Sequence, residues 1–182
     1  MNEVRPNWRP GDARPDIASM LRVDQAGEYG AMRIYAGQLA VLGDRHPAAH
    51  SIARMAEQER RHLAHFDAML AERGVRPTLL QPVWSAAGHA LGAVTALISP
   101  EAAMACTAAI ETEIDKHYQG QRDALGDDDP DLSETIAEFQ AEELEHRDTA
   151  LAAGAERAVG YPVLSTLIRA GCRAAIALSK RI

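Results

Sequence analysis

Two copies of one pattern of glutamate and histidine constrain this sequence more than any other feature. In each copy a single glutamate precedes the tetrapeptide Glu-x-x-His, by 31 residues in the first copy (28 to 59) and 32 in the second (111 to 143). Positions i and i+3 of a helix share one face, so the Glu and His of each tetrapeptide can point at the same place. Each copy therefore predicts a helical hairpin, and the six residues are Glu28, Glu59, His62, Glu111, Glu143 and His146.

All six residues fall within the apolar stripes of their expected helices. The first stripe has the alternating spacing of three and four that is typical of a bundle seam, and it reads Leu21, Gln25, Glu28, Met32, Tyr35, Leu39 and Leu42. The other three stripes also carry their acidic residues at mid-length. Glu113 could compete with Glu111 through an i,i+4 contact with His117, but the register of the stripe favours Glu111.

Four carboxylates buried together need a positive charge between them, because buried like charges repel and each costs many kcal/mol. No Lys or Arg lies on the four stripes near these glutamates. Two metal cations would neutralise the cluster, and the alternative is a bundle with protonated or water-solvated core glutamates. The sequence therefore favours a dinuclear metal centre of the kind found in di-iron four-helix bundles.

A site rich in carboxylates with one imidazole per metal suits iron or manganese better than zinc, and we expect iron. The reactions open to such a centre are oxygen reduction, hydroxylation, radical generation and iron oxidation. His117 and Tyr118 follow Glu111 by six and seven residues, about two helical turns. They either pack in the core or take part in proton or electron transfer near the site. His65 follows His62 by one turn and is expected on the surface.

The composition predicts an all-α fold. Only 4% of the 182 residues are aromatic and 47% are apolar, with much Ala and Leu and few runs suited to a sheet. Breaks at Gly and Pro predict a flexible arm at 1–16 and one domain at 17–182. Its bundle helices are expected at about 17–43, 47–74, 100–125 and 130–156, with apolar helices at about 82–98 and 162–181.

Charge and cysteine content exclude several classes of function. The net charge of −7, without a basic face through the core helices, makes nucleic acid an unsuitable partner. Two cysteines, Cys106 and Cys172, are too few for a disulfide framework, which fits a reducing compartment. The N-terminus lacks the apolar core of a secretory signal, and no segment has the length and apolarity of a membrane span.

The two apolar helices nevertheless predict contact with a membrane surface. The segment at 82–98 is apolar nearly all round, which indicates either a buried crossover between the two metal-binding halves or a helix lying in lipid. The C-terminal segment combines apolar residues with the cations Arg169, Arg173, Lys180 and Arg181. Side by side, these helices would form an apolar surface with a basic rim, as in interfacial proteins. The competing interpretation is an oligomer interface.

Several long strings carry a family resemblance. They lie at residues 21–31 (Leu-Arg-Val-Asp-Gln-Ala-Gly-Glu-Tyr-Gly-Ala), 33–38, 103–107 and 142–146 (Glu-Glu-Leu-Glu-His). In these strings the chain closely resembles the demethoxyubiquinone hydroxylase family of ubiquinone biosynthesis, and the likeness runs from about residue 20 to 178. Lys116 stands where we expect histidine in some relatives, which affects no proposed ligand.

The resemblance implies a ferritin-like di-iron fold with two iron ions per chain, held by Glu28, Glu59, His62, Glu111, Glu143 and His146. It also implies hydroxylation of the ring of a polyprenylated demethoxyubiquinol with O2, in the penultimate step of the pathway. NADH would be the ultimate reductant, acting at a shallow, unconventional site or through the bound quinone. The alternatives are a ferroxidase or iron-storage protein and a lipid-carrying module with a vestigial site.

The same resemblance sets expectations for location and partners. Without a mitochondrial presequence, the expected place is the cytoplasmic side of a bacterial cell membrane, where the protein would be peripheral. The expected partners are the quinol substrate, O2, the membrane surface and a ubiquinone-biosynthesis complex that includes a lipid-binding protein. A homo-oligomer is a further expected assembly.

Overall fold

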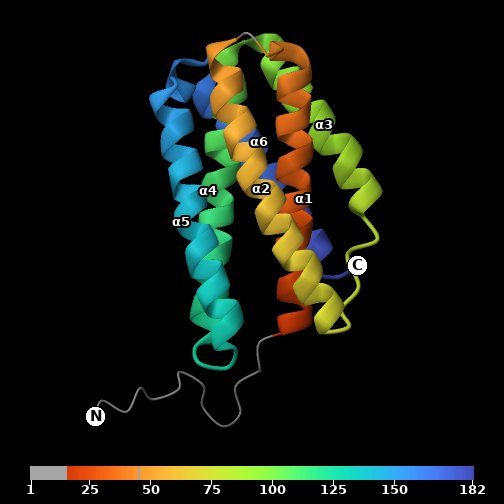
Figure 1. Cartoon of the computed structure of the whole chain (residues 1–182). Helices are drawn as coiled ribbons and strands as arrows, with labels where there is room; N and C mark the ends of the chain where they lie inside the picture. Colours follow the sequence, from red (N-terminus) through yellow and green to blue (C-terminus); the bar gives the residue numbers. More distant parts are fainter. Residues whose placement is uncertain (1–15, 45) are drawn as a thin grey trace, which may run out of the picture.

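The computed structural model describes residues 16–44 and 46–182, which form six α-helices and one short 3-10 helix, without a strand in these ranges (Figure 1). The helices are α1 (Ile17–Leu42), α2 (Pro47–Glu72), α3 (Gln81–Ile98), α4 (Pro100–Leu125), α5 (Pro130–Ala152) and α6 (Tyr161–Ser179). The prediction of an all-α fold is confirmed. The expected arm at 1–16 lies outside the described residues except for Asp16.

The starts of the helices follow from local sequence. Helices α2, α4 and α5 each have proline in the first turn, where no backbone N–H is needed. The side chains of Asp16, Ser99 and Asp129 accept hydrogen bonds from backbone N–H groups in the first turns of α1, α4 and α5. Such caps satisfy donors that the helix leaves free. These signals explain why the chain breaks where it does.

Helix α5 ends at Ala152, earlier than the expected end near residue 156. Gly154 adopts a left-handed conformation with φ 99°, and Ala155–Arg157 then forms a 3-10 turn. A residue with positive φ ends a helix, and glycine adopts this conformation without strain. The chain therefore leaves the bundle at this point and turns into α6.

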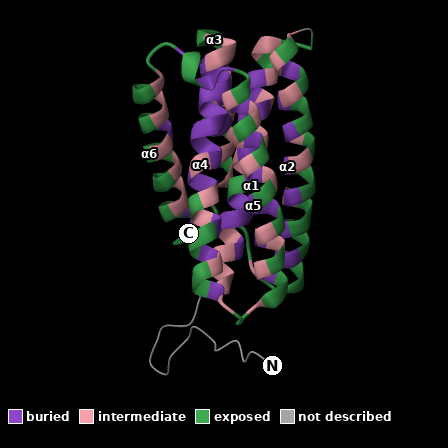
Figure 2. Ribbon diagram, turned by 90° about the vertical axis from the view of Figure 1, so that its left-hand side faces the viewer, coloured by how far each residue is buried: buried purple, intermediate pink, exposed green. Residues whose placement is uncertain are grey.

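Helices α1, α2, α4 and α5 form the four-helix bundle, while α3 and α6 lie against its outside (Figures 1 and 2). Helix α3 packs mainly along α1, and α6 packs mainly along α4. Helix α4 is therefore covered on several sides, and every residue from 102 to 111 is buried. The centre of α4 is thus the most enclosed place in the bundle.

The contact between α1 and α3 is unusually close. A Cβ atom at Gly37 would overlap the carbonyl oxygen of His89, and one at Gly92 would overlap the carbonyl oxygen of Ile34. Glycine at these two positions therefore lets the two backbones touch. Helix α3 therefore packs tightly against α1 at these two positions.

The outer faces of α3 and α6 are apolar and exposed. On α3 the side chains of Val94, Leu97 and Ile98 are more than half exposed, at 54%, 71% and 57%, and on α6 the large side chain of Leu167 is 66% exposed. The alternative in which α3 is simply buried is therefore wrong for this face. Within the described residues, none of the helices combines the length and the apolarity that crossing a bilayer requires.

Candidate metal centre

The structure brings the six predicted residues together in the middle of the bundle. Each bundle helix contributes at mid-length, and no member of the set is more than 2% exposed. Helices α1 and α4 give one glutamate each, while α2 and α5 give a glutamate and a histidine each: Glu28, Glu111, Glu59 with His62, and Glu143 with His146. Residues far apart in sequence thus meet because their stripes face the same core.

The six residues form two overlapping groups. One group is Glu28, Glu59, His62 and Glu143, and the other is Glu59, Glu111, Glu143 and His146. Within each group the nearest ligand atoms all lie within 4.8 Å of one another. Glu59 and Glu143 belong to both groups, so their carboxylates are placed to bridge two metal positions.

Both histidines present the same ring nitrogen to the carboxylates. Nδ1 of His62 lies 3.2 Å from Oε1 of Glu143 and 3.5 Å from Oε2 of Glu28. Nδ1 of His146 lies 3.1 Å from Oε1 of Glu59 and 3.2 Å from Oε2 of Glu143. A neutral imidazole that donates through Nε2 would therefore offer the lone pair of Nδ1 to a metal.

The centre contains polar atoms that are buried without a hydrogen-bond partner, a rare condition in proteins. They include both carboxylate oxygens of Glu59, Oε2 of Glu28, Oε2 of Glu111, Oε1 of Glu143 and Nδ1 of His62. All of these atoms can act as metal ligands, and oxygen ligands with one imidazole per position suit iron. The donor set therefore fits a dinuclear metal centre.

The buried carboxylates of the cluster cannot all carry charge without compensation. Burial and the nearby Glu143 raise the pKa values of Glu59 and Glu111 well above their ordinary range. Burial opposes the charge of Glu143 as well, but hydrogen bonds from His146 and His62 lower its pKa to about 2. Only some of the carboxylates can ionise together unless cations take the place of protons.

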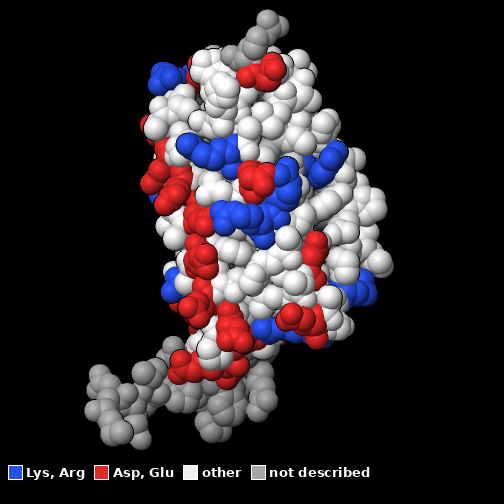
Figure 3. All heavy atoms as spheres, viewed as in Figure 1, with Lys and Arg blue, Asp and Glu red and all other residues white. Residues whose placement is uncertain are grey.

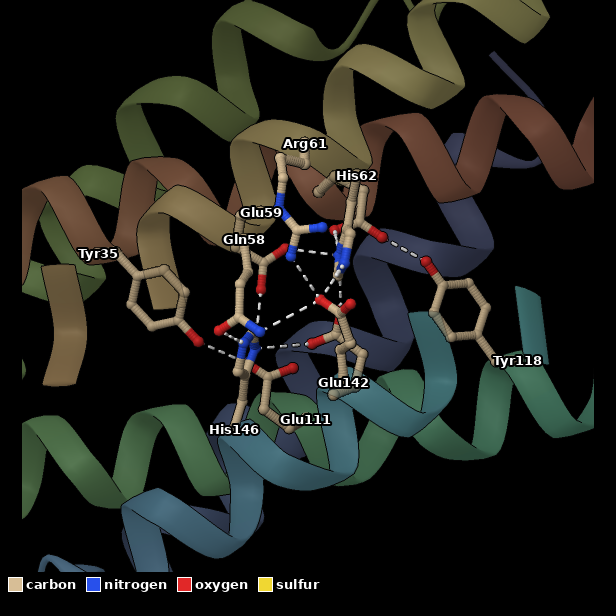
Figure 4. A network of polar contacts seen from close by, with 11 residues as sticks. Tyr35, Gln58, Glu59, Arg61, His62, Glu111, Tyr118, Glu142 and His146 are labelled. Carbon is tan, nitrogen blue, oxygen red and sulfur yellow. Dashed lines mark hydrogen bonds and ion pairs between the residues drawn. The ribbon is translucent and has the colours of Figure 1, made fainter. Parts of the chain in front are cut away.

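Two tyrosines support the single glutamates across the bundle. Tyr35 on α1 donates a hydrogen bond of 2.6 Å to Glu111 on α4, and Tyr118 on α4 donates one to Glu28 on α1 (Figure 4). Each tyrosine lies seven residues after the glutamate of its own helix. Each tyrosine thus pairs with the glutamate of the other helix, so the two halves of the site are related by an approximate two-fold symmetry.

The other predicted residues lie outside the cluster. Nε2 of His117 lies 3.3 Å from Oδ1 of Asp24, and His117 belongs to neither group of potential metal ligands. His65 is exposed, as expected. Glu113 points away from the centre and forms ion pairs with Arg169, Arg173 and Lys116. The structure thus places Glu111, rather than Glu113, in the cluster.

Sequence reasoning missed Gln58 and Glu142, which contact the outer nitrogens of the two histidines. Nε2 of His146 lies 3.0 Å from Oε1 of Gln58, and Nε2 of His62 lies 3.0 Å from Oε2 of Glu142. Each of these residues immediately precedes the glutamate of a Glu-x-x-His tetrapeptide. That shared position was the one signal that could have found them.

A mainly apolar cavity of about 570 Å³ lies between α1, α3, α4 and α6 and reaches the centre. Its lining includes Glu28 and Tyr118 at the metal-binding side, and Asp24 and His117 nearby. Most of the remaining lining is aliphatic: Val23, Ile34, Leu91, Ile110, Ile114, Leu164, Leu167, Ile168 and Ile176. A cavity of this size and character is typical of a site for a small apolar molecule.

This chain is similar to known proteins of ubiquinone biosynthesis. The family model described as ubiquinone biosynthesis protein COQ7 matches residues 15–179. A 3-demethoxyubiquinol 3-hydroxylase from Rhodospirillum rubrum is 55% identical over 175 residues, covering 95% of this chain and 82% of the relative. A mitochondrial NADPH-dependent 3-demethoxyubiquinone 3-hydroxylase from Homo sapiens is 48% identical over 174 residues, covering 93% and 80%. A mitochondrial 5-demethoxyubiquinone hydroxylase from Saccharomyces cerevisiae is 44% identical over 179 residues, covering 90% and 77%.

Proposed function

Because this chain belongs to the family of ubiquinone biosynthesis protein COQ7, we propose that it hydroxylates the ring of a polyprenylated demethoxyubiquinol, with O2 as oxidant. The observation that carries this proposal is the cavity, which leads from the apolar helices α3 and α6 to Glu28 and Tyr118 beside the metal-ligand cluster. A quinol ring at the inner end would leave its tail among aliphatic side chains. The protein is thus an oxidoreductase of ubiquinone biosynthesis.

Two iron ions per chain are the metals that we propose for the centre. One would be held by Glu28 and His62, the other by Glu111 and His146, with Glu59 and Glu143 shared between them. When bound, such a pair of irons supplies the electron transfer to O2 that ring hydroxylation requires. The chain contributes the helical register that brings the four carboxylates and the two imidazoles to one place.

The residues around the cavity have roles that follow from their placement. The aliphatic lining excludes water from the ring and from the cluster. Asp24 is buried, and its burial raises the pKa of its carboxyl, although hydrogen bonding to His117 opposes the shift. We assign the pair of Asp24 and His117 to exchanging a proton with a hydroxyl group of the quinol, since both residues line the same cavity.

The electrons would come from a reduced nicotinamide nucleotide. We propose NADH, while the names of several relatives specify NADPH. The described residues contain no strand, so they hold no doubly wound nucleotide fold. The nucleotide would therefore bind in a shallow site or pass its electrons to the centre through the bound quinone. Parallel assays with NADH and with NADPH decide which nucleotide supplies the electrons.

The exposed faces of α3 and α6 support a peripheral position on a membrane. They place large apolar side chains next to the cavity, where a polyprenyl tail would have to enter from lipid. We propose attachment to the cytoplasmic side of the cell membrane. The same faces would serve contacts with a lipid-binding partner, with other enzymes of the pathway or with a second copy of the chain.

The decisive test is turnover by the iron-loaded protein. A short-tailed demethoxyquinol is incubated with O2 and NADH or NADPH, and the hydroxylated product is measured by mass spectrometry. Glu143→Ala should abolish product, and Glu145→Ala, a change at an exposed glutamate of the same helix, should leave it unchanged. Iron bound and nucleotide consumed without hydroxylated product would instead indicate an oxidase or a ferroxidase, and the proposed reaction would be withdrawn.

A further inference from the structure

The metal ligands and the tyrosines of the two halves of the centre match by approximate two-fold symmetry, but the residues that contact the outer nitrogens of the histidines do not. The tyrosines, the glutamates and the histidines all occur as matched pairs. The residues that contact the outer nitrogens of the histidines do not match, because Gln58 on α2 is an amide and Glu142 on α5 is a carboxylate. The centre is therefore chemically asymmetric beyond its metal ligands.

Gln58 and Glu142 connect the two histidines in one continuous chain of contacts. Oε1 of Gln58 faces Nε2 of His146 at 3.0 Å, and Nε2 of Gln58 donates to Oε2 of Glu142 at 3.2 Å. The same oxygen of Glu142 lies 3.0 Å from Nε2 of His62. Figure 4 shows this path from His146 to His62 across α2 and α5.

The chain of contacts accounts for a hydrogen on Nε2 of each histidine. Glu142 can only accept when ionised, so His62 donates to it through Nε2–H. Gln58 uses its N–H group on Glu142, which leaves its oxygen to accept from Nε2–H of His146. In its neutral form each histidine would therefore have Nδ1 free of hydrogen and directed at the carboxylates of the centre.

Arg61 holds Glu142 from the solvent side. Its Nη2 lies 3.0 Å from Oε2 of Glu142, and the side chains of Arg61 and Glu142 are 56% and 22% exposed. Figure 3 shows basic side chains gathered near the middle of the face formed by α2 and α5, beside a row of acidic ones along α5. Gln58 has no cation of this kind among its hydrogen-bond partners.

An imidazole that donates to a carboxylate is a stronger metal ligand than one that donates to a neutral amide, because the carboxylate draws the hydrogen toward itself. We propose that Glu142 and Gln58 are positioning residues that make the two metal positions unequal, so that the position of Glu28 and His62 fills before that of Glu111 and His146. This inference rests on the dinuclear centre of the proposed function. To that centre the inference adds the order in which the two metal positions fill, and it names the residues that set this order.

The test is a titration of the metal-free protein with Co²⁺, followed by visible absorption under anaerobic conditions. Wild-type protein should bind two equivalents in two resolved steps. Glu142→Gln, which gives both imidazoles an amide partner, should weaken the first step about tenfold and merge it with the second. Gln58→Met leaves Nε2 of His146 without its partner and should weaken the second step more than the first. Glu145→Gln is the matched control on the exposed side of α5.

Each outcome has a definite meaning. Two equivalents bound in a single step by wild-type protein, or two unaltered steps in Glu142→Gln, would overturn the inference and leave the dinuclear centre intact. Binding of fewer than two equivalents by wild-type protein would overturn the centre itself. Circular dichroism of each metal-free variant checks folding, and because Gln58→Met acts on the opposite step, it tests the inference even where Glu142→Gln does not fold.

Discussion

The phenol of Tyr35 and the carboxylate of Glu111 form a buried hydrogen bond of 2.6 Å between α1 and α4. Burial and the charge of Glu111 raise the pKa of Tyr35 well above its ordinary value, so the phenol keeps its proton. Tyr35→Phe removes the donor that orients Glu111, and we expect iron affinity to fall about tenfold. Iron content after dialysis measures this, with Tyr161→Phe, at the start of α6, as control. Unchanged iron content would contradict a role in orienting the ligand.

Gly171 allows a direct test of the cavity. It lines the cavity on α6, and a Cβ atom there meets no other atom within 4 Å. Gly171→Phe should fill the cavity and raise KM for the quinol at least tenfold, with iron content unchanged. Gly171→Ala should preserve turnover and raise the free energy of unfolding by about 0.5–1 kcal/mol, because alanine favours a helix. An unchanged KM in the phenylalanine variant would place the quinol elsewhere.

Gly92 and Gly120 should respond in opposite ways to the same substitution. Gly92→Ala forces a Cβ atom into the carbonyl of Ile34, so we expect the free energy of unfolding to fall by about 1–3 kcal/mol as α3 is displaced. Gly120→Ala meets no atom within 4 Å and should stabilise α4 by about 0.5–1 kcal/mol. Urea unfolding of both variants measures whether each substitution lowers or raises the free energy of unfolding. Stabilisation by Gly92→Ala would show that α1 and α3 do not touch.

The lowered pKa of Asp129 predicts that the free energy of unfolding depends on pH. Burial of Asp129 raises its pKa, but the hydrogen bond and charge of Arg73 and the backbone N–H of Leu132 together outweigh that effect, so the folded pKa lies below the usual value. A lowered carboxyl pKa contributes stability above the unfolded pKa of about 3.9, and this is lost as pH falls through the folded pKa. Asp129→Asn keeps a capping side chain but loses the ion pair.

We therefore expect Asp129→Asn to cost about 0.5–1 kcal/mol in the free energy of unfolding at pH 7 and progressively less below pH ~4. The measurement is urea unfolding of metal-free protein at pH 7 and at successive lower values. A difference between variant and wild type that stays constant over this range would rule out the ion pair with Arg73 as its source.

The sequence was sufficient to predict the helices and to bring six residues to one place, because both depend on periodicity within single helices. Glu28 and Glu111 could be chosen over polar neighbours such as Glu113 because only they keep the register of the stripe. Gln58 and Glu142 lie outside the stripes of their own helices, and their contacts depend on how α2 and α5 face each other. Such cross-helix contacts leave no periodic signal.

The end of α5 and the shape of the cavity could not be predicted from the sequence, because both depend on how the helices pack. Gly154 could be read as a break, but its positive φ and the 3-10 turn that follows arise from the packing of the link to α6. The cavity is bounded by four helices, and its volume follows from their separation rather than from any one segment. The apolar pattern predicted that the outer helices are largely apolar, but it gave no indication of the cavity that they cover.

Because the backbones of α1 and α3 touch at Gly37 and Gly92, we expect these two helices to move together. Opposite them, α6 is held through side chains, with Arg169 bonded to Glu113 at 2.6 Å and Ser179 bonded to Trp84 at 3.0 Å. We therefore expect the α6 side of the cavity to yield more readily than the side formed by α1 and α3. A bulkier quinone ring should then be accommodated by displacement of α6, so that α6 rather than α3 would limit the ring substituents that the cavity accepts.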